Sequence, residues 1–144
     1  MIMQHRRKCL YLATAVFTGT IVWFGTVFAI HAQVNREGPK SLFSAKLPNV
    51  PGKSLTAVVV NYKPGGKSSA HKHAGSVFAY VVSGKIRSQN SATGPARVYA
   101  VGECFFEPDG SEHMVSENAS ATEPASLLAI FVADDGARLT TPSK

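Results

Sequence analysis

The chain has 144 residues, of which 44% are hydrophobic and 17% charged, enough for one domain with its own core. The formal net charge is +6, but three of the fifteen basic residues lie in the first 32 positions, so the rest carries twelve basic and nine acidic side chains. That remainder contains no lysine or arginine run, which excludes the charge pattern of a nucleic-acid-binding surface.

Residues 1–32 have the pattern of a secretory signal peptide. A charged start at residues 5–8 precedes an apolar run over residues 9–30, which ends in small residues at Ala29 and Ala32. We expect cleavage after Ala32 or, as an alternative, after Ala29. The other interpretation is an uncleaved anchor, because about 20 apolar residues can span a bilayer. Both interpretations, cleaved signal and uncleaved anchor, predict a periplasmic or secreted domain. The domain touches the membrane only if this segment is retained.

The remaining sequence predicts an all-β domain over residues 42–136, between a polar tether at 33–41 and a C-terminal tail at 137–144. Short apolar or β-branched runs alternate with turns rich in glycine and proline, and no segment has a sustained helical period. The expected strands cover residues 54–62, 77–82, 85–89, 96–100, 104–107, 113–117 and 125–133. The last is apolar at every position but Ser126, which suits a strand buried on both faces. This pattern favours a sandwich or barrel.

Three histidines follow the leader: His71, His73 and His113. His71 and His73 are two residues apart, so on a strand they share one face. His113 opens a later strand, after the turn at residues 108–110. Three imidazoles from two strands could bind a divalent metal on one side and leave positions open for a substrate.

The spacing of these residues resembles the two cupin motifs. Gly65, His71-Lys72-His73 and Gly84 are similar to the first motif, except that Val77 stands where the family has a glutamate. Gly102, Pro108-Asp109-Gly110 and His113 are similar to the second, with Asn118 one place later than the family's asparagine. The resemblance implies a single double-stranded β-helix, or jelly-roll barrel, with His71, His73 and His113 binding a divalent metal inside its mouth.

Val77 changes the metal that this site should prefer. Valine cannot coordinate, and three imidazoles neutralise none of the charge of a divalent ion. We therefore expect Fe, Zn, Ni or Cu before Mn, because the former favour nitrogen ligands. A Val77→Glu substitution should add a ligand and tighten Mn²⁺ binding.

Another carboxylate could replace the glutamate that is absent at position 77. Glu112 should point away from His113, and Glu117 lies four residues further along the strand. Glu107 is the best candidate for a catalytic base or for a group that orients a histidine. The alternative interpretation of Glu107 is a surface carboxylate at the end of a strand.

The remaining side chains are expected to be structural. Cys104 is interpreted as a small core residue, with a redox-active position in the cavity as the alternative. The aromatic side chains expected in the core, one or two of them lining an apolar pocket, are Phe78, Tyr80, Phe105 and Phe106.

Three functions stay open from the sequence. The first is an exported metal-dependent enzyme acting on a small organic molecule, with dioxygenase- or isomerase-like chemistry. The second is a non-catalytic cupin that binds a metal or small ligand. The third is a structural barrel that forms a homodimer, pairing through sheet edges.

Overall fold

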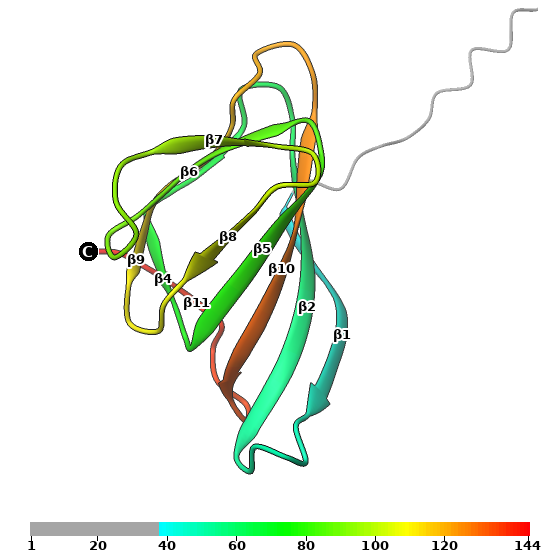
Figure 1. Ribbon diagram of the computed structural model, residues 1–144, viewed down its shortest axis with the longest axis vertical. Helices are drawn as coiled ribbons and strands as arrows, with labels where there is room; N and C mark the ends of the chain where they lie inside the picture. Colours follow the sequence, from blue (N-terminus) through cyan, green and yellow to red (C-terminus); the bar gives the residue numbers. More distant parts are fainter. Residues whose placement is uncertain (1–37) are drawn as a thin grey trace, which may run out of the picture. The chain divides into compact units, whose positions relative to one another are not determined.

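The computed structural model describes residues 38–144, which form two antiparallel sheets packed face to face (Figure 1). One sheet has the strand order β1-β2-β10-β5-β8, and the other has the order β11-β4-β9-β6-β7, with β3 also paired to β9. The strands are β1 (Gly38–Lys46), β2 (Lys53–Tyr62), β3 (Lys67–Ser68), β4 (His71–His73), β5 (Ser76–Ser83), β6 (Lys85–Asn90), β7 (Arg97–Ala100), β8 (Cys104–Glu107), β9 (Glu112–Asn118), β10 (Ala125–Asp134) and β11 (Thr140–Pro142). This is the expected all-β double-stranded β-helix, and residues 38–144 contain no helix.

The five-stranded sheet supplies most of the apolar core. Along β5, Val77, Ala79 and Val81 are buried while the residues between them face outward, as strand alternation requires. On β10, Leu127, Ala129 and Phe131 are buried in the same way. The expectation that the β10 run is buried on both faces is wrong, because the alternate residues are half-buried or exposed.

The six-stranded sheet has a polar inner face. Its buried polar side chains are Ser88, Asn90, His113, Ser116 and Asn118. Burying polar groups is unfavourable unless they find partners. An apolar inner face opposite a polar one therefore places the candidate site between the two sheets.

A glycine-bearing turn joins β5 to β6. Gly84, the last residue of the first motif, has φ 67°. A Cβ there would lie 2.5 Å from the Pro124 carbonyl oxygen. Only glycine combines this conformation with so close an approach of two backbones.

The domain is longer at both ends than the sequence predicted. Its first strand begins at Gly38, so part of the expected 33–41 tether is a strand paired along β2. The expected 137–144 tail contains β11, which pairs with β4. The β11 segment is short and polar and its partner β4 is distant in sequence, whereas β1 pairs with the next strand along the chain. The predicted leader, residues 1–32, lies outside the described residues.

Several expected core residues instead cover the outer face of the five-stranded sheet. Phe78, Tyr80 and Phe106 are exposed, and so is Cys104. They occupy the outward positions of β5 and β8, so strand alternation carries them away from the cavity.

Within residues 38–144, the chain contains no helix that could cross a membrane.

Candidate metal centre

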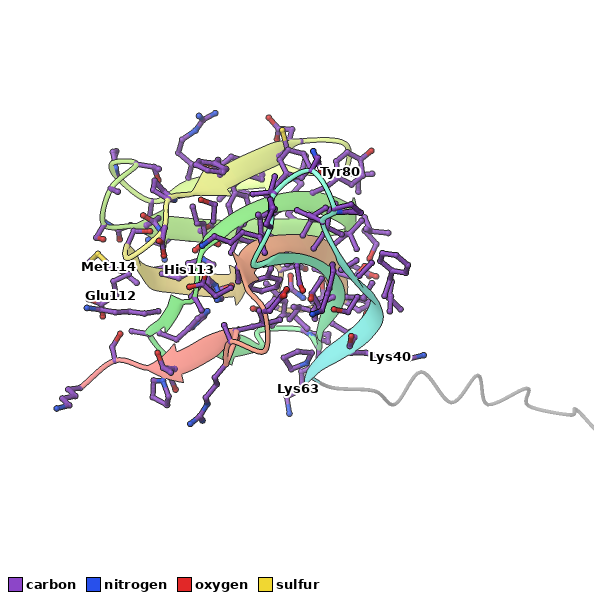
Figure 2. The ribbon with its side chains drawn as sticks, turned by 90° about the horizontal axis from the view of Figure 1, so that it is seen from below. Lys40, Lys63, Tyr80, Glu112, His113 and Met114 are labelled. Atoms are coloured by element: carbon purple, nitrogen blue, oxygen red, sulfur yellow. The ribbon has the colours of Figure 1, made fainter. Side chains whose placement is uncertain are left out.

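The three histidines converge between the sheets. His71 and His73 lie on β4, and His113 on β9 is the cross-strand partner of His71. One ring nitrogen of each lies within 4.8 Å of the others, which confirms the predicted convergence. Figure 2 shows His113 directed into the interior, while its chain neighbours Glu112 and Met114 lie at the periphery. The three residues are thus positioned to bind one metal ion.

Hydrogen bonds to the outer nitrogens fix two of the rings. Nδ1 of His71 lies 2.7 Å from the carbonyl oxygen of Ser69, and Nδ1 of His73 lies 3.2 Å from that of Leu139. Because a carbonyl only accepts, both Nδ1 atoms donate, which leaves each Nε2 with its lone pair. These two Nε2 atoms are 3.2 Å apart. Such outer contacts are typical of metal-binding histidines.

His113 is held by its other nitrogen. Its Nε2 lies 2.9 Å from the Ser88 hydroxyl. Its Nδ1 is buried and has no hydrogen-bond partner among the described residues. A buried polar atom without a partner costs free energy. A metal ion would satisfy it, so the donor set fits such an ion.

Burial also keeps the histidines in the form that metals require. It lowers the pKa of His73 to about 4, with repulsion from His71 as the second cause. Burial lowers the pKa of His113 to about 3, and repulsion from His71 and His73 adds to it. Both imidazoles are therefore neutral at pH 7, and neutral imidazole is the metal-binding form.

Glu107 lies within the same group of side chains. It is 2% exposed, so the alternative of a surface carboxylate is wrong. Its Oε1 is 3.1 Å from Nδ1 of His113, and its Oε2 is 3.7 Å from Nε2 of His73. Burial raises the pKa of Glu107 to about 7, against a smaller opposing effect of the hydrogen bond donated by Asn90. Its role as a base or histidine orienter stays a prediction.

Val77 lies where the first motif places it, on the inner face of β5. It is 1% exposed and lines the same cavity as the three histidines. Its cross-strand partner on β8 is Glu107. Of the other carboxylates, Glu117 pairs with Arg87 at 2.8 Å, and Glu112 faces away from the interior (Figure 2).

The histidines form one wall of a cavity of about 440 Å³. Its other walls are mainly apolar and come from the five-stranded sheet. Phe105 is the one member of the predicted aromatic group that lines it. Arg138, exposed and just before β11, also contributes to the lining. This volume is within the range of about 300–1,000 Å³ that small-molecule sites occupy.

The sequence reasoning missed several residues that support the site. Ser88 and Asn90 occupy inward positions of β6, where they contact His113 and Glu107. Ser88 had a signal, because it is a polar residue on the same face as Ile86 in the predicted strand 85–89, whereas Asn90 lies just beyond that strand. Leu139 had no such signal, since it acts through its backbone carbonyl. Asn118, the displaced motif asparagine, is structural: its side-chain amide donates to the carbonyls of Lys63 and Glu123.

Fold and site together define a β-helix barrel with a three-histidine cavity, and sequence comparison gives its family. The family model described as "Cupin domain" matches residues 58–131. The chain therefore belongs to the cupin family, as its motifs predicted. No curated protein matches the chain.

Solved structures agree with this fold at low sequence identity. A Klebsiella pneumoniae protein with a double-stranded β-helix domain is 20% identical, with a TM-score of 0.56 over 74% of this chain and 86% of that one. The DMSP lyase DddQ from Ruegeria pomeroyi is 20% identical, with a TM-score of 0.53 over 62% of this chain and 43% of that one. The Cnp3 cupin domain from Schizosaccharomyces pombe is 22% identical, with a TM-score of 0.52 over 67% of this chain and 60% of that one.

Proposed function

We propose that this protein is a metal-dependent cupin that acts on a small organic molecule outside the cytoplasm. The observation that carries the proposal is the convergence of three histidine nitrogens on the wall of a mainly apolar cavity. Similar folds include a protein named as a lyase and a cupin domain whose name states no activity, so the fold does not decide between an enzyme and a binder.

The chain's own residues suit this task. His71, His73 and His113 would hold the ion on one side, with the cavity on the other. When bound, the metal would supply a Lewis acid with open coordination positions. The apolar walls would exclude water and strengthen electrostatic contacts with a bound molecule.

The cavity also favours a class of substrate. Its walls suit an aromatic or other apolar body, while the metal and Arg138 would both attract negative charge. An enolic or carboxylate-bearing aromatic molecule fits this combination. Oxygen-dependent cleavage or isomerisation of such a molecule is the dioxygenase- or isomerase-like activity that we propose.

The proposed location depends on residues 1–32, whose charged, apolar and small-residue segments follow in the order of an export signal. Intact-mass measurement on protein from the native host would detect loss of about 32 residues. Full-length protein in the membrane fraction would replace secretion with anchoring by residues 9–30.

Metal content tests the central part of the proposal. Protein purified without added metal and then loaded with Fe²⁺ or Zn²⁺ should bind about one ion per chain, and His113→Ala should bind at least tenfold more weakly. Turnover of an enolic aromatic by the loaded protein would support an enzyme. Tight binding without turnover would support the non-catalytic alternative, and no binding would contradict the proposal.

A further inference from the structure

The carboxylate missing at position 77 has a counterpart on the neighbouring strand. Val77 on β5 and Glu107 on β8 are directly paired in the sheet, and both are buried on its inner face. Side chains at directly opposed positions have Cβ atoms about 5 Å apart. A glutamate side chain is long enough to bridge that distance, so a carboxylate from either residue can reach the same space.

The contacts of Glu107 agree with that placement. Its two oxygens approach ring nitrogens of two different histidines, His113 at 3.1 Å and His73 at 3.7 Å. The contact with Nδ1 of His113 lacks hydrogen-bond geometry, since that nitrogen is without a partner. A carboxylate oxygen and an imidazole nitrogen that face each other without a hydrogen bond are arranged as two ligands around a common point.

The cost of burying this carboxylate leads to the same conclusion. Glu107 is 2% exposed, and both of its ion-pair contacts are with the histidines of the site. A buried carboxylate is costly unless it is hydrogen-bonded and paired or coordinates a metal. Asn90 donates to Oε2 at 3.2 Å, which orients the group and leaves Oε1 free toward the histidines. Ligating carboxylates are commonly oriented in this way.

We propose that Glu107 is the fourth protein ligand of the metal centre, so that β8 supplies the carboxylate that position 77 on β5 lacks. This inference rests on the proposed metal site and adds a ligand to it. The centre would then contain three imidazoles and one carboxylate. It would also bind hard ions better than three histidines alone. The expected preference for Fe, Zn, Ni and Cu over Mn therefore becomes smaller.

The test uses the full-length chain, with Mn²⁺ and Zn²⁺ as separate probes in chelator-competition titrations. Glu107→Gln keeps the size of the side chain and removes its charge. We expect it to weaken Mn²⁺ binding by about tenfold or more and Zn²⁺ binding by less, because Mn²⁺ depends more on carboxylate oxygen. The matched control is Glu112→Gln, which removes a charge next to His113 on the outward side and should change neither affinity.

A double variant, Glu107→Val with Val77→Glu, exchanges the paired residues and keeps the composition of the site. It should recover most of the Mn²⁺ affinity that Glu107→Gln loses, because the carboxylate returns to the same space from β5. X-ray absorption of the Zn²⁺-loaded parent gives a second readout that needs no variant. It should require an oxygen ligand of carboxylate type beside three imidazoles.

The outcomes separate this inference from the proposed function. Glu107→Gln with parental affinity for both ions, together with loss of binding in His113→Ala, would overturn the role of Glu107 and leave the three-histidine site intact. A folded double variant that binds Mn²⁺ no better than Glu107→Gln would also overturn it. A parent chain that binds neither ion would contradict both proposals.

Discussion

The residues of the site were predictable where a motif or strand alternation identified them. His71, His73, His113 and Val77 occupy the inward positions that their spacing predicted. Glu107 was singled out, but its position beside Val77 was not predicted, because the β5–β8 register pairs residues that are far apart in the chain. Spacing along one strand predicts the face of a residue, whereas its neighbours across the sheet come only from the structure.

The buried carboxylate should make metal-free protein sensitive to pH. The pKa of Glu107 is raised from 4.5 to about 7 in the folded state, so the fold favours the protonated form. This contribution to stability is complete below about pH 4.5 and is lost as the pH rises through about 7. The full effect is on the order of 3 kcal/mol.

Denaturant unfolding of chelator-treated protein would measure this effect. Between pH 5 and 8 the parent should lose stability relative to Glu107→Gln, which has no group to ionise there. The lowered pKa values of His73 and His113 act in the opposite direction, reducing stability as the pH falls from about 6.5 toward 4 and 3. The histidines lower the stability of both proteins equally at acid pH, so the difference between the two free energies of unfolding reports on Glu107 alone. Parallel curves from pH 5 to 8 would contradict the account.

At the scale of elements, the apolar strands of the five-stranded sheet were the easiest to predict. Each of the seven expected strands is present within two residues of its predicted bounds. The first strand was missed because it begins within the polar segment 33–41, and the last because it is polar and pairs with the distant β4. The last of them, β11, matters for the site, because the segment leading into it provides the Leu139 carbonyl that orients His73.

Removing the C-terminal segment should therefore weaken metal binding. Truncation after Ala137 deletes β11 and both neighbours of the His73 Nδ1 atom, the Leu139 carbonyl and the Thr140 hydroxyl. We expect Zn²⁺ affinity to fall by about 10–100-fold, the usual effect of losing a group that orients a ligand. Truncation after Ser143, which removes only Lys144, is the control. Equal Zn²⁺ affinity of the two truncated chains in chelator competition would show that β11 does not support the site.

At the scale of the whole molecule, the outer face of the five-stranded sheet is unusually apolar. One cross-strand row contains Phe43, Ala57, Ile130, Phe78 and Phe106, one residue from each strand. Phe43, Phe78 and Phe106 are each more than 40% exposed. An exposed apolar patch of this extent usually marks an interaction site. Alternation makes the outward positions predictable, but Phe78 and Phe106 were expected in the core.

The homodimer expected from the sequence stays a prediction, and this face, rather than a sheet edge, is its best location. Five strands about 4.8 Å apart, with an average length of about eight residues, cover roughly 600 Å², close to the 800 Å² per partner of a typical stable interface. The centre of the row carries no charge, so two copies can meet around a two-fold axis without like charges opposing each other.

Light scattering after size exclusion would test the dimer. The parent should elute with twice the chain mass, and Phe78→Lys at the centre of the row should raise the dimer dissociation constant by at least tenfold, since it buries a charge. The matched control is Met114→Lys, an exposed position on β9 in the other sheet, which should stay dimeric. A monomeric parent, or a Phe78→Lys protein as dimeric as the parent, would rule out this face.

Anomalous diffraction from crystals of the metal-loaded protein tests the central claim most directly. We predict one strong peak between the two sheets, within about 2.3 Å of a nitrogen from each of His71, His73 and His113 and of an oxygen from Glu107. A peak bound by the three histidines without Glu107 would contradict the fourth ligand. A peak elsewhere, or none at full metal loading, would contradict the metal centre itself.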